Sequence, residues 1–196
     1  MSKIYSLAWI FLRPLFHLVF PHRINGRENV PAGGGFVLCI NHISGFDPIH
    51  VATCLPFKRQ IRYMAKKELW NIKLLKQMLN ELKCIPVDRG NADLSAVRTA
   101  MQVVKDGHPL GIFPQGTRSK NNQPTPFLGG ASMIALRAGV PVIPCYIDGP
   151  YRLFRRCDVS FGPAVDLSDF GRRCDSDTIA AVTARIEDAV WQLRTK

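Results

Sequence analysis

Short apolar runs alternate with amphipathic segments along most of the chain. Runs bounded by Gly, Pro or charged residues predict strands at 36–40, 61–65, 84–87, 109–113, 140–146 and 158–161. Apolar residues at helical spacing predict helices at 47–55, 67–82, 92–105, 130–138 and 177–194. Strands that alternate with helices indicate an α/β domain, built on a largely parallel sheet flanked by helices.

Two of the predicted helices carry signals for where they begin. Asp47 followed by Pro48 predicts an Asp N-cap with Pro at the first helical position, and Ser176 predicts the N-cap of the last helix. The chain has 196 residues and no linker or low-complexity segment. We therefore expect one domain over 23–196, preceded by a separate segment over 1–22.

The segment before this domain is strongly apolar. Residues 4–20 hold 13 apolar or aromatic residues out of 17, but Arg13-Pro14 interrupts the middle and no A-x-A-like cleavage site follows. On a helix, Ser6, Arg13 and His17 fall within about 40° of one another, and the rest of the circumference is apolar. This pattern predicts a helix lying in a membrane interface; the alternative is a helix that covers an apolar patch of the domain. Together with the reduced compartment that the cysteines indicate, we expect the cytoplasmic side of the cell membrane.

Charge is the unusual feature of the composition. The chain has 26 Lys+Arg against 15 Asp+Glu, a net charge of +11 and a pI near 9.7. A polyanionic neighbour is expected: a nucleic acid, an anionic membrane or a phosphorylated substrate. Seven basic residues against only Glu68 stand between 58 and 76. Five arginines form a second cluster without an assigned role: Arg152, Arg155, Arg156, Arg172 and Arg173.

The six cysteines indicate a reduced compartment. They contain no C-x-x-C pair, so a thiolate zinc site has little support and we expect no metal. Cys39, Cys84 and Cys145 lie inside apolar runs, which predicts small core residues. Zinc-finger spacing and the aromatic block of RNA-binding sheets are both missing from the sequence, which argues against nucleic acid.

A histidine and an aspartate stand five residues apart where a strand gives way to a helix. In the segment 41–47 (NHISGFD), His42 and Asp47 are placed where ligands bind in open α/β sheets. If the carboxylate holds one ring nitrogen of His42, the other is free to act as a general base. The alternative keeps Asp47 as a helix cap and His42 as an ordinary loop residue.

Two further strand ends carry residues suited to anions. Segment 111–119 (GIFPQGTRS) offers a Gly-containing turn, hydroxyls and Arg118, which together could hold a phosphate, although it also fits an ordinary turn. Segment 85–90 (IPVDRG) ends in Arg89, which could equally be a solvated turn residue.

Taken in order, these blocks resemble the glycerolipid acyltransferase family, whose best-known members are the lysophosphatidic acid acyltransferases. The resemblance rests on 25–31 (NGRENVP), NHISGFD, IPVDRG, FPQGTRS and 140–144 (VPVIP), and it covers residues 25–144. The H-x4-D and F-P-x-G-T-R-S blocks are the specific ones. The resemblance implies a membrane-associated enzyme that moves a fatty acyl group from acyl-CoA or acyl carrier protein to the sn-2 hydroxyl of lysophosphatidic acid.

Roles for single residues follow from the same resemblance. It implies that His42 is the general base and Asp47 its orienting partner, and that no cofactor or metal is needed. It assigns binding of the acceptor, including its phosphate, to Arg89, Gln115, Gly116, Thr117 and Arg118. The family usually has Glu where this chain has Gln115, which leaves open another lysolipid or amino-lipid acceptor. A basic module without catalysis is the alternative from a different class.

Overall fold

The computed structural model describes residues 3–88, 93–119, 123–171 and 174–194. Seven strands form one sheet in the order β1-β7-β6-β2-β5-β3-β4. Every pairing is parallel except β6 with β7. The strands are β1 (Ile24–Asn25), β2 (Phe36–Ile40), β3 (Arg62–Lys66), β4 (Ile85–Val87), β5 (Pro109–Ile112), β6 (Val142–Asp148) and β7 (Asp158–Phe161). The α/β class and the largely parallel sheet are thus confirmed.

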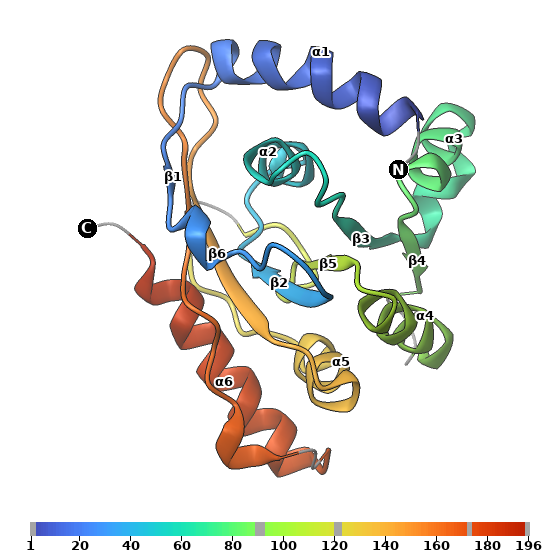
Figure 1. Cartoon of the computed structure of the whole chain (residues 1–196), viewed down its shortest axis with the longest axis vertical. Coiled ribbons are helices and arrows are strands. Elements are labelled where there is room, and N and C mark those ends of the chain that lie inside the picture. Colours follow the sequence, from blue (N-terminus) through green and yellow to red (C-terminus); the bar gives the residue numbers. More distant parts are fainter. Residues whose placement is uncertain (1–2, 89–92, 120–122, 172–173, 195–196) are drawn as a thin grey trace.

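Helices cover both faces of this sheet (Figure 1). One face carries α2 (Asp47–Cys54), with α1 (Lys3–Val19) lying over it. The other carries α4 (Leu94–Lys105), α5 (Gly130–Ala138) and α6 (Ser176–Gln192). A further helix, α3 (Lys73–Glu81), lies near the N-terminal end of α1.

The central strand β2 joins the two halves of the core. Phe36, Leu38 and Ile40 pack with Val51 and Cys54 of α2, whereas Val37 and Cys39 pack with residues of α4, α5 and α6. All five strand residues are fully buried. Alternate side chains of a strand point to opposite faces, so a continuous apolar run is what a strand covered on both sides requires.

The expected helix over 67–82 is wrong as a single element. The structure has a 3-10 turn η2 (Lys67–Asn71) followed by α3, with Ile72 in extended conformation between them. Asn71 stands at the break, and asparagine favours turns over helix interiors. The Trp70 indole N–H donates to Asn80 Oδ1 at 2.8 Å, which folds the turn back on the helix. Apolar spacing alone could not show this break.

Two predicted caps are also corrected. Phe46 occupies the N-cap of α2 and no side chain caps that end, so Asp47 is not a cap. In α6 the cap is Asp175, whose Oδ1 accepts from the backbone N–H of Thr178 at 2.9 Å, and Ser176 is the first helical residue. The strand β1, only two residues long, was too short for a pattern to predict.

The N-terminal helix combines features of both expectations for it. Tyr5, Phe16 and the following Phe20 are buried against the domain, and Arg13 Nε donates to the carbonyl of Thr53 at 3.2 Å. Its outer side exposes large apolar residues: Leu7, Ile10, Phe11, Leu12, Leu15 and Leu18. Within the described residues, no helix has the length and apolar character needed to cross a bilayer.

Candidate active site

Asn41 determines where the chain leaves β2. Its side chain is fully buried and binds β6 twice: Nδ2 donates to the Ile147 carbonyl at 3.0 Å, and Oδ1 accepts from the Ile147 N–H at 2.7 Å. The amide thus replaces a backbone pair of the sheet. The backbone turns away at this point and carries His42 to the carboxyl ends of the parallel strands.

The Asp47 carboxylate binds back onto the loop before its helix. Its Oδ2 lies 2.7 Å from Nδ1 of His42 and accepts from the backbone N–H groups of Ile43 and Ser44 at 2.7 and 2.8 Å. Asp47 is fully buried, and the side chain of His42 is 14% exposed. A carboxylate that accepts from Nδ1 leaves the lone pair on Nε2, the tautomer that a general base needs.

Two aromatic rings hold the imidazole in place. The His42 ring stacks on Phe113, with centroids 4.3 Å apart and planes 30° apart, and Phe113 stacks in turn on Tyr63 at 5.8 Å. The Tyr63 hydroxyl donates to the carbonyl of Pro48 at 2.9 Å, which joins this stack to the start of α2. The ring plane is therefore fixed by packing as well as by Asp47.

Gln115 connects the loop after β5 to the histidine. Its Oε1 accepts from the backbone N–H of His42 at 2.6 Å, and its Nε2 donates to Oγ1 of Thr125. A second bond runs the other way, from the Ser119 N–H to the His42 carbonyl at 2.8 Å. Gln115 is buried, so both ends of its amide are used within the protein.

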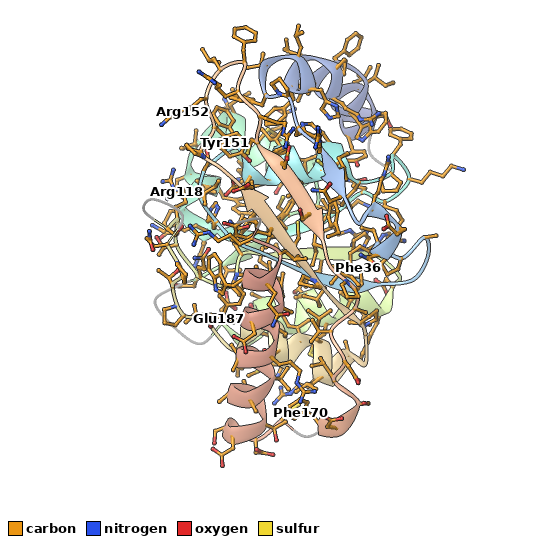
Figure 2. The ribbon with its side chains drawn as sticks, turned by 90° about the vertical axis from the view of Figure 1, so that its left-hand side faces the viewer. Phe36, Arg118, Tyr151, Arg152, Phe170 and Glu187 are labelled. Carbon is orange, nitrogen blue, oxygen red and sulfur yellow. The ribbon has the colours of Figure 1, made fainter. Side chains whose placement is uncertain are left out.

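The next residues of this loop reach the surface. Gly116 has φ of 70°, which favours glycine, and a Cβ there would lie 2.9 Å from the Leu128 side chain. Thr117 and Arg118 are exposed, and Figure 2 shows Arg118 at the edge of the molecule. Because β2, β5, β3 and β4 are parallel, the segments after them leave from one edge of the sheet. Arg89, predicted for the same site, lies outside the described residues.

Sequence reasoning missed several residues that shape the site. Thr125 binds Gln115, and Phe113 and Tyr63 pack in line with His42. Tyr151 interacts with Asp47: burial, and next the charge of that carboxylate, raise the pKa of its phenol above the ordinary range. Only Phe113 stood inside a quoted motif; the others come from distant segments, so spacing could not have found them.

Comparisons with known proteins identify the family of the chain. Residues 22–148 match the Acyltransferase family model. The 1-acyl-sn-glycerol-3-phosphate acyltransferase of Bacillus subtilis is 32% identical over 180 residues, 89% of this chain and 88% of that protein. The Streptococcus pneumoniae enzyme of the same name is 31% identical over 164 residues, 81% of this chain and 60% of that protein.

A solved structure has the same fold. The crystal structure of the 1-acyl-sn-glycerophosphate acyltransferase PlsC from Thermotoga maritima superposes with a TM-score of 0.76, at 23% identity, over 98% of this chain and 80% of that one. The resemblance inferred from the sequence motifs is confirmed by the family match and by the Bacillus relative. The chain belongs to the glycerolipid acyltransferase family.

Proposed function

We propose that the protein transfers a fatty acyl group from an acyl thioester to the sn-2 hydroxyl of lysophosphatidic acid, giving phosphatidic acid. The observation that carries this proposal is the 2.7 Å contact between Nδ1 of His42 and the buried carboxylate of Asp47. The names of the relatives support the reaction. The two donors considered are acyl-CoA and acyl carrier protein, used as a co-substrate; no cofactor or metal takes part in the proposed reaction.

In the proposed mechanism, Nε2 of His42 accepts the proton of the acceptor hydroxyl as its oxygen attacks the thioester carbonyl. The tetrahedral intermediate then collapses, the C–S bond breaks, and the proton on His42 passes to the departing thiolate. Asp47 keeps Nδ1 protonated and stabilises the imidazolium between the two steps. A thioester is already activated, so proximity and proton transfer suffice without an acyl-enzyme.

The acceptor phosphate is proposed to bind on the loop after β5. Thr117 and Arg118 are exposed there, only a few residues from Gln115, which contacts the His42 backbone. A phosphomonoester carries about −1.5 to −2 charges near pH 7, and a guanidinium can bind it through two parallel hydrogen bonds. Arg89, which follows β4 by two positions in the sequence and lies outside the described residues, is the second proposed phosphate ligand. For Gln115 we propose a positioning role, because its amide is committed to His42 and Thr125.

The lipid substrate also requires a membrane contact, for which we propose the outer side of α1. Its exposed Leu and Phe residues form a continuous apolar side, with Leu18, for instance, 68% exposed, while Arg13 and His17 are half-buried and Arg13 binds the carbonyl of Thr53. Exposed apolar patches of this kind mark membrane or protein contacts. We therefore propose peripheral attachment to one leaflet, on the cytoplasmic side of the cell membrane.

Two neighbouring segments extend the proposed membrane surface. The tip of the β6–β7 hairpin exposes Leu153 and Phe154 between arginines, and the Phe154 N–H donates to the Val19 carbonyl of α1 at 2.8 Å. Figure 2 places Arg152 of this tip near α1. At the other end of α1, Ile72 and the helix α3 that follows it expose further apolar side chains, Leu74 and Met78 among them. Five exposed lysines flank these segments and could bind anionic headgroups: Lys58, Lys66, Lys67, Lys73 and Lys76.

The test is acyl transfer by purified full-length protein, with lysophosphatidic acid, other lysophospholipids and amino-lipids as acceptors and both thioester types as donors. We expect phosphatidic acid as the main product, with the new acyl chain released by a lipase specific for sn-2. Transfer to another lysolipid but not to lysophosphatidic acid would change the acceptor assignment. No transfer with any pair would reject the enzymatic proposal in favour of a basic membrane-binding module.

A further inference from the structure

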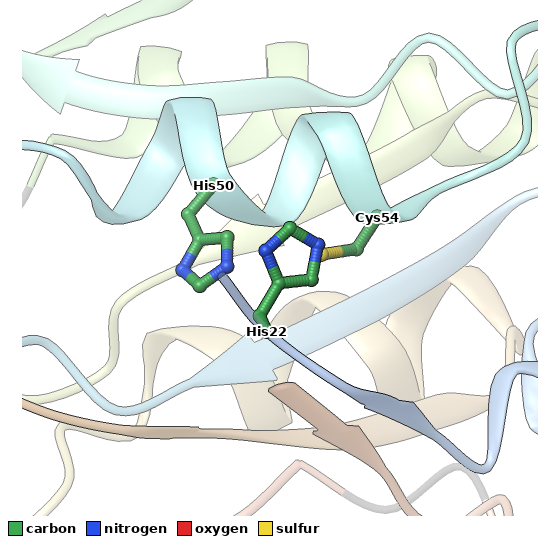
Figure 3. Close-up of side chains that lie close together, drawn as sticks. All are labelled: His22, His50 and Cys54. Carbon is green, nitrogen blue, oxygen red and sulfur yellow. The ribbon is translucent and has the colours of Figure 1, made fainter. Parts of the chain in front are cut away.

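A second group of polar side chains lies where α1 meets α2, apart from the His42 site. His50 and Cys54 stand one turn apart on α2, and His22 follows the end of α1 (Figure 3). One nitrogen from each histidine and the Cys54 sulfur all lie within 4.8 Å of one another. His17 adjoins them, with its ring centroid 4.0 Å from that of His22.

Hydrogen bonds occupy Nδ1 of both histidines and leave Nε2 of each ring for this group. Nδ1 of His22 lies 3.0 Å from the Phe20 carbonyl, to which it can only donate, so the lone pair is on Nε2. Nδ1 of His50 lies 3.0 Å from the Tyr151 hydroxyl. His50 is fully buried, and its Nε2 has no hydrogen-bond partner within the described part of the chain. Metal-binding histidines typically have this arrangement, with the second ring nitrogen held by an oxygen.

The donor set indicates which class of ion would fit. Two imidazole nitrogens and one thiol, without a carboxylate, suit a borderline-soft transition metal far better than Ca²⁺ or Mg²⁺. Bonds of about 2.0–2.3 Å to a tetrahedral Zn²⁺ place ligand atoms roughly 3.3–3.8 Å apart. Side-chain shifts of about 1 Å would therefore close the cluster.

We propose that His22, His50 and Cys54 form a Zn²⁺ site that fastens α1 to α2. Both Nε2 atoms donate lone pairs to the ion; the Cys54 thiol loses its proton to solvent as the Zn–S bond forms. A fourth position is left for water or His17. The ion would lie one helical turn beyond Asp47 and tie the apolar helix to the element that carries the catalytic carboxylate.

Two of the proposed ligands, His50 and Cys54, are uncharged in the absence of metal. Burial, with smaller contributions from His22 and His17, lowers the pKa of His50 to about 3, so its ring is neutral and free to coordinate near pH 7. Burial raises the pKa of Cys54 to about 12, so zinc must displace a proton to bind. Because His22 lies 28 positions before His50, a search for closely spaced cysteines could not find the site.

The test uses the untagged full-length chain in detergent, stripped with a chelator and then given ZnCl₂. We expect one zinc per chain by elemental analysis, and a melting temperature about 5–10 °C higher at a hundredfold excess over Kd. With Co²⁺ in place of zinc, a sulfur-to-metal charge-transfer band should appear and should be lost in Cys54→Ser.

Matched variants make the result specific. His22→Gln and Cys54→Ser should lose the stoichiometric zinc, whereas His108→Gln and Cys145→Ser, which are not among the proposed ligands, should keep it. Cys145 is as buried as Cys54, so it controls for packing, and His22 is only half-buried, so its variant remains informative if Cys54→Ser does not fold. A wild type without stoichiometric zinc, or equal uptake by all four variants, would overturn the proposal.

Discussion

The backbone N–H of His42 and the side-chain Oε1 of Gln115 are joined by a 2.6 Å hydrogen bond. This bond links the loop after β2, which carries His42 and leads to Asp47, to the loop after β5, which carries the exposed Arg118. The two halves of the proposed site are therefore in direct contact. A glutamate at this position would offer the same acceptor to His42, so the departure from the family pattern is compatible with the geometry.

Replacing Gln115 should test this link. Gln115→Ala leaves the His42 N–H without its acceptor, which costs about 1–3 kcal/mol, and we expect kcat to fall about tenfold or more with a lower melting temperature. Gln115→Glu should keep most of the activity, since its carboxylate can accept from His42 and from the Thr125 hydroxyl. The exposed Gln77→Ala serves as control. Normal kcat in Gln115→Ala would remove the positioning role.

Replacing Arg118 should raise the KM for the acceptor lipid but not the KM for the acyl donor. Loss of a charge-assisted hydrogen bond costs about 1.5–3 kcal/mol, so in Arg118→Ala the KM for lysophosphatidic acid should rise about ten- to hundredfold. The KM for the acyl donor should change little, as should both constants in Arg98→Ala, which alters an exposed arginine on α4. An equal loss with a monoacylglycerol acceptor, which lacks phosphate, would make the role of Arg118 structural.

The outer side of α1 should govern binding to lipid vesicles. Burying a large apolar side chain contributes about 1.5–3 kcal/mol, so Phe11→Gln combined with Leu18→Gln should weaken binding to anionic vesicles about a hundredfold or more. The control is Leu94→Gln, which changes an exposed leucine on α4, on the far side of the sheet. Flotation of the full-length proteins measures the effect; unchanged flotation of the double variant would contradict the membrane assignment.

Asp93 should make stability depend on pH at the acid end. Its carboxylate accepts from the backbone N–H groups of Ala96 at 2.9 Å and Asp88 at 3.1 Å, and these bonds lower its pKa to about 2. Because the folded pKa lies below the unfolded one, this stabilisation is present above about pH 4 and is lost as the pH falls towards 2. Melting curves of wild type and Asp93→Asn should converge across that window; a constant difference would contradict the assignment.

Much of the fold could be predicted because its strands are covered on both sides. Segments such as 36–40 and 158–161 read as unbroken or alternating apolar runs, and both form strands with the predicted bounds. The predictions failed for elements whose bounds depend on backbone conformation and not on the spacing of apolar side chains. Ile72 interrupts an apolar spacing that would otherwise continue, and β1 pairs with β7 through two residues only.

Some residues of the site could also be predicted from the sequence, and others could not. The residue types and spacing of His42 and Asp47 suggested a pair but left the helix cap open; the direction of the Asp47 carboxylate, towards His42 and the preceding loop, excludes the cap. Tyr63 and Tyr151 are brought to the site only by packing of distant segments. The same is true of His22 beside Cys54, which no local pattern connects.

The most direct test of the account is the kcat of His42→Ala and Asp47→Asn, measured with the melting temperature of each. General-base catalysis supplies about 10²–10⁴-fold, and both variants should lose turnover on that scale. Asp47→Asn should melt close to the wild type, since an amide oxygen can still accept from Ile43 and Ser44. Full acyl transfer by His42→Ala, or near-normal kcat in Asp47→Asn, would contradict the assignment of these two residues to proton transfer.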